Sequence, residues 1–227
     1  MLRVRFQLFA AAAILMSAVA GAAAAEPQTP VEALFNGNHL KLTKAGHELS
    51  YRFQRSVSHE KVLGAPFSDD LKLDVTGEKD GDKRDFQFKV FSGERARDPM
   101  ADHDRTGNPI LLWYLDHSVN SYRGLAGGGL TYVKSRFMNA LKDATAEPIK
   151  IDVAGKSVDA FRMTLLPYAK DPNSAKMMGY ENSSFVIVYS DAVPGYFVEM
   201  SATYENTDKK APRLEERVSF VGEGEKK

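Results

Sequence analysis

A short run of oxygen-bearing side chains near the middle of the chain could bind a cation. Asp102, Asp104 and Thr106 are spaced two residues apart and Gly107 follows them, which matches the first half of a calcium-binding loop. The second half does not match, because Trp113 stands where such a loop has a bidentate Glu. Two interpretations remain open: a calcium site, or a solvated loop that forms a turn before the next helix.

The histidines show no catalytic or metal-binding spacing. The five residues are His39, His47, His59, His103 and His117, and no two have the spacing of a helical zinc-binding motif. The chain has no Cys, and the G-x-S-x-G and S-x-x-K signatures of serine nucleophiles are absent. A hydrolase would need distant histidines (two or more of 39, 47, 103 and 117) to converge with a carboxylate in a cleft. We predict that the protein is not an enzyme and has no cofactor.

Two predicted helices place polar and aromatic side chains opposite their apolar faces. Trp113, the only Trp, lies one helical turn before His117 on the first helix. On the second helix, Tyr132 and Arg136 have the same spacing, and Lys134 interrupts the apolar face. One interpretation is the mouth of a ligand site, with aromatic walls and charges for an anionic head group. The other is that Trp113 packs under a loop while the Lys134 ammonium extends to water.

The elements that must position these side chains follow from the periodicity of the apolar residues. A period of about 3.6 predicts helices from Pro109 to about Arg123 and from Leu130 to before Pro148. Elsewhere apolar and polar residues alternate, which predicts about eight strands. Side chains expected to line the sheet include Phe86, Phe88, Phe161, Met163, Phe185, Phe197 and Met200. The sequence therefore predicts an α+β fold, a curved antiparallel sheet that could form an unclosed barrel, covered on one face by a central helical pair.

The first 25 residues have the pattern of an export signal. Arg3 and Arg5 precede an apolar stretch, and small residues end at Ala25. We predict cleavage after Ala25, a single domain over residues 26–227 and a periplasmic location. The remaining 202 residues carry 28 basic and 30 acidic side chains, a balance that argues against a nucleic-acid partner. No later segment has the roughly 18 apolar residues of a transmembrane helix, so we expect no membrane anchor once the signal is removed.

Three segments resemble a family of Gram-negative exported proteins that has no assigned activity. They are GNPILLWYLDHSV, KSRFMNAL and SDAVPGYFVEM, and the likeness extends over residues 33–206. The order of strands, helices and strands is also similar to that of the periplasmic lipoprotein-carrier (Lol) superfamily, whose unclosed barrel holds acyl chains under a helical lid. This second resemblance concerns the layout only, so it implies a binding function but no site residues.

These features together predict a non-enzymatic periplasmic protein that binds a lipid or other amphiphile in an apolar groove under the helices. The alternative is a structural or protein-interaction module of the cell envelope, with a solid core, a protein partner and no small ligand. The concave face of the sheet distinguishes the two, because a lined cavity favours the binding protein and large side chains that meet across it favour the module.

Overall fold

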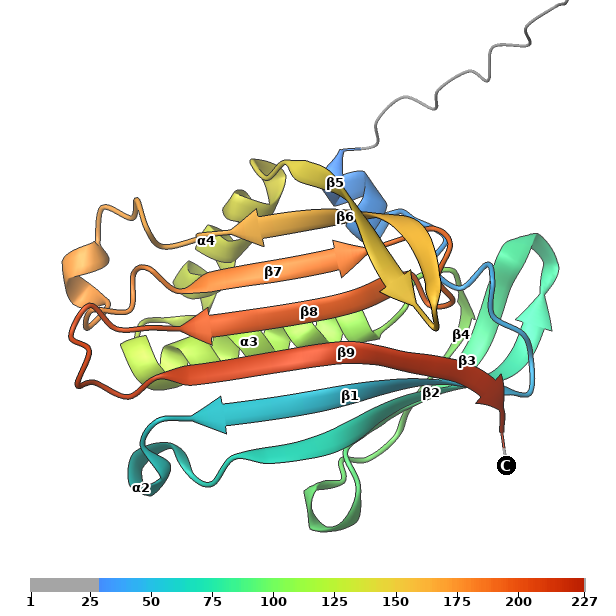
Figure 1. Cartoon of the computed structure of the whole chain (residues 1–227), viewed down its shortest axis with the longest axis horizontal. Coiled ribbons are helices and arrows are strands. Elements are labelled where there is room, and N and C mark those ends of the chain that lie inside the picture. Colours follow the sequence, from blue (N-terminus) through green and yellow to red (C-terminus); the bar gives the residue numbers. More distant parts are fainter. Residues whose placement is uncertain (1–28, 227) are drawn as a thin grey trace, which may run out of the picture.

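The computed structural model describes residues 29–226, in which nine strands form one antiparallel sheet (Figure 1). The strands are β1 (His47–Val57), β2 (Phe67–Lys79), β3 (Lys83–Val90), β4 (Met100–Arg105), β5 (Ala146–Val153), β6 (Lys156–Leu165), β7 (Ser184–Tyr189), β8 (Phe197–Tyr204) and β9 (Leu214–Glu225). The helices are α1 (Pro30–Phe35), α2 (Glu60–Leu63), α3 (Ile110–Ala126) and α4 (Leu130–Lys142). The predicted export signal lies outside the described residues.

The sheet is open, with β4 at one edge and β5 at the other. Its order is β4-β3-β2-β1-β9-β8-β7-β6-β5, and α3 and α4 lie together across one face (Figure 1). The predicted α+β class, with an unclosed antiparallel sheet and a helical pair on one face, is therefore confirmed. None of the helices in residues 29–226 combines the length and the apolar character that crossing a bilayer requires.

One strand was missing from the prediction. Residues 100–105 were expected to form a loop, and they form the edge strand β4, which pairs with β3. All but one of its six side chains are exposed, so the strand has no buried face and no apolar alternation to reveal it. Its backbone pairing, which side-chain periodicity does not report, holds it in the sheet.

The helical face of the sheet is packed with large aromatic side chains. Tyr122 of α3 stacks on Tyr168 with a centroid distance of 3.8 Å, and Phe137 of α4 meets Phe185 of β7 at 4.7 Å. Phe185 in turn contacts Tyr204 of β8 at 5.6 Å. All five side chains are almost fully buried. The space directly beneath α3 and α4 is therefore a filled core.

The start of α3 is tied to the turn between β7 and β8. The Asn108 side-chain oxygen accepts the backbone N–H of Ile110 at 3.1 Å, as expected of a residue that caps a helix. The side-chain amide of Asn108 also donates to the Gly195 carbonyl and to the Tyr51 hydroxyl, both at 2.8 Å. One side chain therefore links the helical pair, the β7–β8 turn and the centre of the sheet.

Replacing Gly195 by Ala should destabilise the protein more than the same change at Gly46. Both glycines have a positive φ, 78° and 83°, which costs other residues about 1–2 kcal/mol. A Cβ at Gly195 would also run into the Tyr51 hydroxyl and come within 2.8 Å of Leu49 Cδ1, whereas one at Gly46 would meet nothing within 4 Å. We expect a loss of about 1 kcal/mol for Gly46→Ala, and about 3 kcal/mol for Gly195→Ala because overpacking adds to the strain. Urea unfolding measures both losses, and equal values would contradict the crowding at Gly195.

Candidate functional site

Trp113 and His117 of α3 lie against the sheet and the loop that follows β3. Their rings are stacked at 4.9 Å, and Trp113 makes edge contacts at 5.8 Å with Phe53 of β1 and with Phe91 of that loop. His117 Nε2 lies 3.1 Å from a carboxylate oxygen of the buried Glu216 on β9. Trp113 thus lies between the sheet and this loop.

Tyr132 and Arg136 of α4 hold the segment that leads from β6 to β7. The Tyr132 hydroxyl donates to Asp171 Oδ1 at 2.5 Å, and Arg136 Nε lies 2.6 Å from Asp171 Oδ2. Burial would raise the pKa of Asp171, but hydrogen bonds from Tyr132 and from the Asn173 N–H, together with the Arg136 charge, outweigh burial and lower this pKa. The Lys134 side chain is exposed. Tyr132 and Arg136 therefore position a loop, and both side chains stay partly exposed.

The predicted calcium ligands lie in and just after the edge strand β4. Asp102 Oδ2 lies 2.7 Å from Arg105 Nε, and Asp104 Oδ1 lies 3.8 Å from Lys79 Nζ. Thr106 follows the strand, and its carbonyl accepts a backbone hydrogen bond at 3.1 Å. Within residues 29–226, no three His, Asp or Glu side chains come together in a way that could hold a metal ion. Each of the two carboxylates thus has its own basic neighbour in the same chain.

The four histidines that a hydrolase would have to bring together contact different partners. The pairs are His39 with the Ala33 carbonyl (2.9 Å), His47 with Glu223 (3.3 Å), His103 with Asp85 (3.4 Å) and His117 with Glu216 (3.1 Å). Each ring is therefore engaged in its own local contact, and we derive no hydrolytic step from them.

A cleft of about 720 Å³ lies between α1, the connection from α4 to β5, the middle of β6 and the end of β7. We call it the aromatic cleft, because Phe161, Tyr189 and Tyr196 form one wall. Thr29, Pro30 and Ala33 of the α1 region face this wall. Phe161 and Tyr189 are paired across β6 and β7. The cleft therefore opens beside the helical pair, at the end of the sheet where the layer of α3 and α4 stops.

The wall of the aromatic cleft is a column of four stacked rings. Phe161 stacks on Tyr189 at 5.6 Å, Tyr189 on Tyr196 at 5.2 Å, and Tyr196 on His39 at 4.6 Å, with interplanar angles of 27°, 20° and 21°. Three of the rings are buried, whereas Phe161 is 45% exposed. The column thus supports one accessible aromatic ring at its outer end.

The inner end of the column is fixed by an unusual backbone and by a neutral imidazole. Tyr196 has a φ of 71°, a left-handed conformation that is rare for a bulky residue and is often found at functional positions. His39 Nε2 lies 2.9 Å from the Ala33 carbonyl oxygen, and Nδ1 accepts the Asn108 N–H at 3.2 Å, so the ring is held as the Nε2–H tautomer. Burial lowers the pKa of His39, which keeps this ring uncharged and suited to aromatic stacking.

The rim of the aromatic cleft carries one charge of each sign. Lys41 Nζ lies 3.1 Å from Asp191 Oδ1, and these side chains are 40% and 75% exposed. Lys and Asp side chains at this exposure stay hydrated and exchange partners at little cost. The rim can therefore receive a polar head group, while the column offers an apolar surface.

The aromatic cleft was not predicted as a site. Phe161 was expected only as a lining residue of the sheet, and its partners come from three other parts of the chain. The available signal was the pair Tyr189 and Tyr196, which flank the connection that contains Pro194-Gly195.

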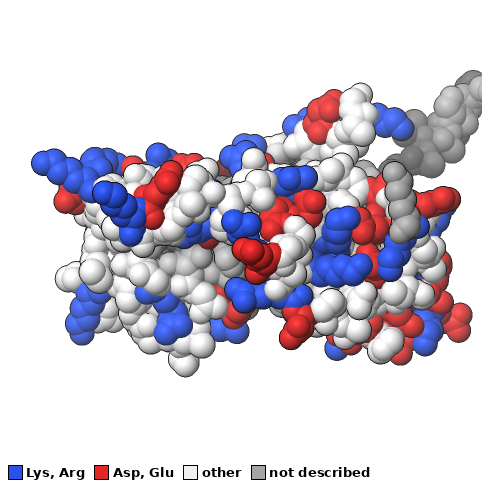
Figure 2. Space-filling view, turned by 90° about the horizontal axis from the view of Figure 1, so that it is seen from below, with Lys and Arg blue, Asp and Glu red and all other residues white. Residues whose placement is uncertain are grey.

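The surface offers no broad field of one sign on the side seen in Figure 2, where basic and acidic side chains are interspersed. No family model matches the sequence, and no curated protein is similar to it. The likeness to the exported family and to the lipoprotein carriers therefore remains a prediction.

Proposed function

We propose that the protein is a non-enzymatic binding protein of the periplasm that holds a lipid or other amphiphile in the aromatic cleft. The exposed Phe161 ring, backed by three buried rings of the same column, is the observation that carries the proposal. Phe161 stacks on Tyr189 and still leaves 45% of its surface exposed, so its ring gives an apolar ligand a flat, supported surface. The volume of about 720 Å³ lies within the range of small-molecule sites.

Affinity would come from burial of the apolar part of the ligand against Phe161 and the partly exposed Pro30 and Ala146. At about 25 cal/mol per Å², burial of about 300 Å² is worth about 7 kcal/mol before ordering costs. The polar head would lie at the rim, beside Lys41 and Asp191. The ligand lies beside α3 and α4 and not beneath them, because aromatic side chains fill the space under the pair. The export-signal pattern of residues 1–25 supports the periplasmic location.

The filled core favours a second candidate, a cell-envelope module that binds a protein partner and no small ligand. Under this alternative the cleft is a surface depression, and Phe161 contributes nothing to the binding of an amphiphile. The two candidates therefore differ in what a substitution at Phe161 does.

The test is a fluorescence titration of residues 26–227 with cis-parinarate, a single-chain fatty acid probe. We expect saturable binding by the wild type and an affinity at least tenfold lower for Phe161→Ala, which is about 1.4 kcal/mol. The matched control is Leu166→Ala, since Leu166 is 53% exposed and follows the same strand but does not line the cleft. Both variants should lose no more than about 1 kcal/mol of unfolding free energy, so both stay folded throughout the titration.

Absence of saturable binding by the wild type, or equal affinities of the two variants, would overturn the proposal. Native mass spectrometry of protein prepared without detergent adds a second readout. A co-purifying amphiphile that is lost in Phe161→Ala supports the binding protein. A bare wild-type protein that also fails to bind the probe supports the interaction module.

A further inference from the structure

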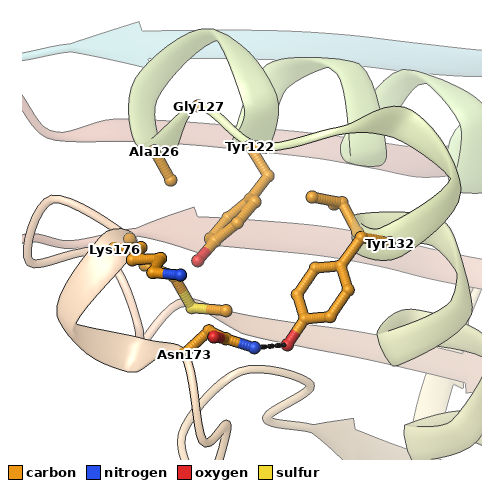
Figure 3. A pocket seen from close by; sticks show the side chains of 9 residues that line it. Tyr122, Ala126, Gly127, Tyr132, Asn173 and Lys176 are labelled. Atoms are coloured by element: carbon orange, nitrogen blue, oxygen red, sulfur yellow. Dashed lines mark hydrogen bonds between the residues drawn. The ribbon is translucent and has the colours of Figure 1, made fainter.

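A second cavity, of about 250 Å³, lies beside the turn that connects α3 to α4. We call it the hairpin pocket. Its lining includes Tyr122, Gly127, Tyr132, Val133, Lys176 and Met177, and Figure 3 shows the side chains of both helices and of the β6–β7 segment around one space. This pocket is separate from the aromatic cleft, which is lined by other residues.

The Tyr122 hydroxyl points into the hairpin pocket without a hydrogen-bond partner. The residue is 1% exposed, and its hydroxyl oxygen is buried and unpaired among the residues that the structure describes. In Figure 3 it points from α3 toward the segment that carries Lys176. An unpaired buried hydroxyl destabilises a fold, and almost all such groups find a partner. A ligand atom that accepts a hydrogen bond would supply one.

Tyr122 is a proton donor at neutral pH and its ring cannot easily turn away. Burial, followed by the charges of Glu181 and Asp171, raises the pKa of Tyr122, so the phenol keeps its proton. The ring is stacked on Tyr168 at 3.8 Å. The O–H group therefore remains directed into the pocket.

Lys176 adds a positive charge to the same space. It ends a short 3₁₀ turn, Ser174–Lys176, and within the described part of the chain it makes no ion pair. Two acids of the same segment lie near this space. Asp171 is already paired with Arg136 at 2.6 Å, and Glu181, whose charge also acts on Tyr122, is not part of the pocket lining. Lys176 is thus the charge in this pocket that remains available to a ligand.

The remaining walls are apolar and the rim is held in place. Ala126, Val133 and Met177 supply hydrocarbon surface. At the rim, Asn173 Nδ2 donates to the Tyr132 hydroxyl at 2.9 Å (Figure 3), and the same hydroxyl donates to Asp171. An engineered cavity of about 150 Å³ in another protein binds benzene, so this pocket has room for one ring and a polar substituent.

We infer that the hairpin pocket binds a small monocarboxylate with a compact apolar body, its carboxylate accepting the Tyr122 O–H and pairing with the Lys176 ammonium. The ring or short hydrocarbon chain of this ligand packs on Val133 and Met177. The site goes beyond the proposed amphiphile binding and does not depend on it, because the two cavities share no lining residue.

Benzoate and its neutral analogue benzamide test this inference by isothermal titration calorimetry on the full mature chain. The wild type should bind benzoate at least tenfold more tightly than benzamide. Tyr122→Phe should weaken benzoate binding at least tenfold, and its urea midpoint without ligand should be unchanged or higher, since the lost hydroxyl has no partner. A lower midpoint together with unchanged benzoate binding would show a purely structural hydroxyl and overturn the inference.

Lys176→Met should remove the preference for benzoate over benzamide, while Lys170→Met, an exposed lysine outside the pocket, should leave it intact. Absence of benzoate binding by the wild type, or equal affinity for the two compounds, would also overturn the inference. Phe161→Ala should bind benzoate as the wild type does, which separates failure of this site from failure of the aromatic cleft.

Discussion

Replacing Phe185 by Ala is expected to lower the free energy of unfolding by about 3–5 kcal/mol. Phe185 is fully buried and joins the two layers of the fold, since its ring meets Phe137 of α4 at 4.7 Å and Tyr204 of β8 at 5.6 Å. Truncation removes these contacts and leaves a cavity between rigid rings that collapse only in part. Urea unfolding followed by circular dichroism measures the loss.

Phe161→Ala is the matched control, because it makes the same chemical change on the same face of the sheet. Phe161 is 45% exposed, so we expect a loss of no more than about 1 kcal/mol. Similar losses at the two positions would mean that the helices do not enclose Phe185 as described. Comparison of the two variants also separates an effect on stability from an effect on ligand binding. Of the two substitutions, only Phe161→Ala should weaken ligand binding directly.

Replacing Glu216 by Gln is expected to cost about 3 kcal/mol at neutral pH. The carboxylate of Glu216 is 3% exposed and faces two basic side chains, Arg55 at 3.4 Å and His117 at 3.1 Å. The Tyr204 hydroxyl lies 3.4 Å from its second oxygen. Removal of the Glu216 charge leaves the Arg55 guanidinium without its partner in a largely buried setting. Loss of one partner of a buried ion pair is strongly destabilising, because the other charge stays buried and uncompensated.

The loss of unfolding free energy caused by Glu216→Gln should be smaller at acidic pH than at neutral pH. Burial would raise the pKa of Glu216, but the hydrogen bond and charge of His117 and the charge of Arg55 outweigh it and lower this pKa. A carboxyl with a lowered pKa stabilises the fold above its unfolded pKa, about 4.3, and loses this contribution as the pH falls through the folded pKa. Unfolding at pH 7 and pH 3 tests the sign, and a difference that stays constant would contradict it.

Glu215→Gln is the control for the same change one residue earlier. Its side chain is 47% exposed and pairs with Arg213 at the surface, so we expect a loss below about 0.5 kcal/mol. An effect as large as that of Glu216→Gln would show that the loss does not come from the buried carboxylate.

The sheet and the helical pair could be predicted because burial imposes a period on the sequence. In β1, Leu49, Tyr51 and Phe53 are buried in alternation, and the structure places this strand as the pattern required. The edge strand β4 could not be found in this way, because its position depends on backbone pairing with β3 and its side chains are exposed. The period of apolar residues in a sequence therefore shows which face of an element is buried. It does not show which strands are paired through their backbones.

The candidate sites were harder to predict than the fold. Tyr132 could be singled out from the sequence, because an aromatic side chain on the polar face of a helix is visible there, and the structure places it in the lining of the hairpin pocket. The aromatic column could not be predicted, since His39, Phe161 and Tyr196 meet only through the order of the strands and the left-handed turn at Tyr196. The unpaired Tyr122 hydroxyl lies on the buried face of α3. A residue on such a face is predicted from the sequence only to pack in the core.

Residue 47 pairs with residue 225 in the middle of the sheet, so the first and last strands meet there. Every other neighbouring pair of strands is consecutive in the chain and can form soon after synthesis, whereas β1 must wait for β9. Until the last strand is released, the chain consists of two unjoined half-sheets whose inner edges are β1 and β8. Such edges pair readily with other chains. The risk of aggregation is therefore greatest before β9 is available to join the two half-sheets, when protection by a chaperone matters most.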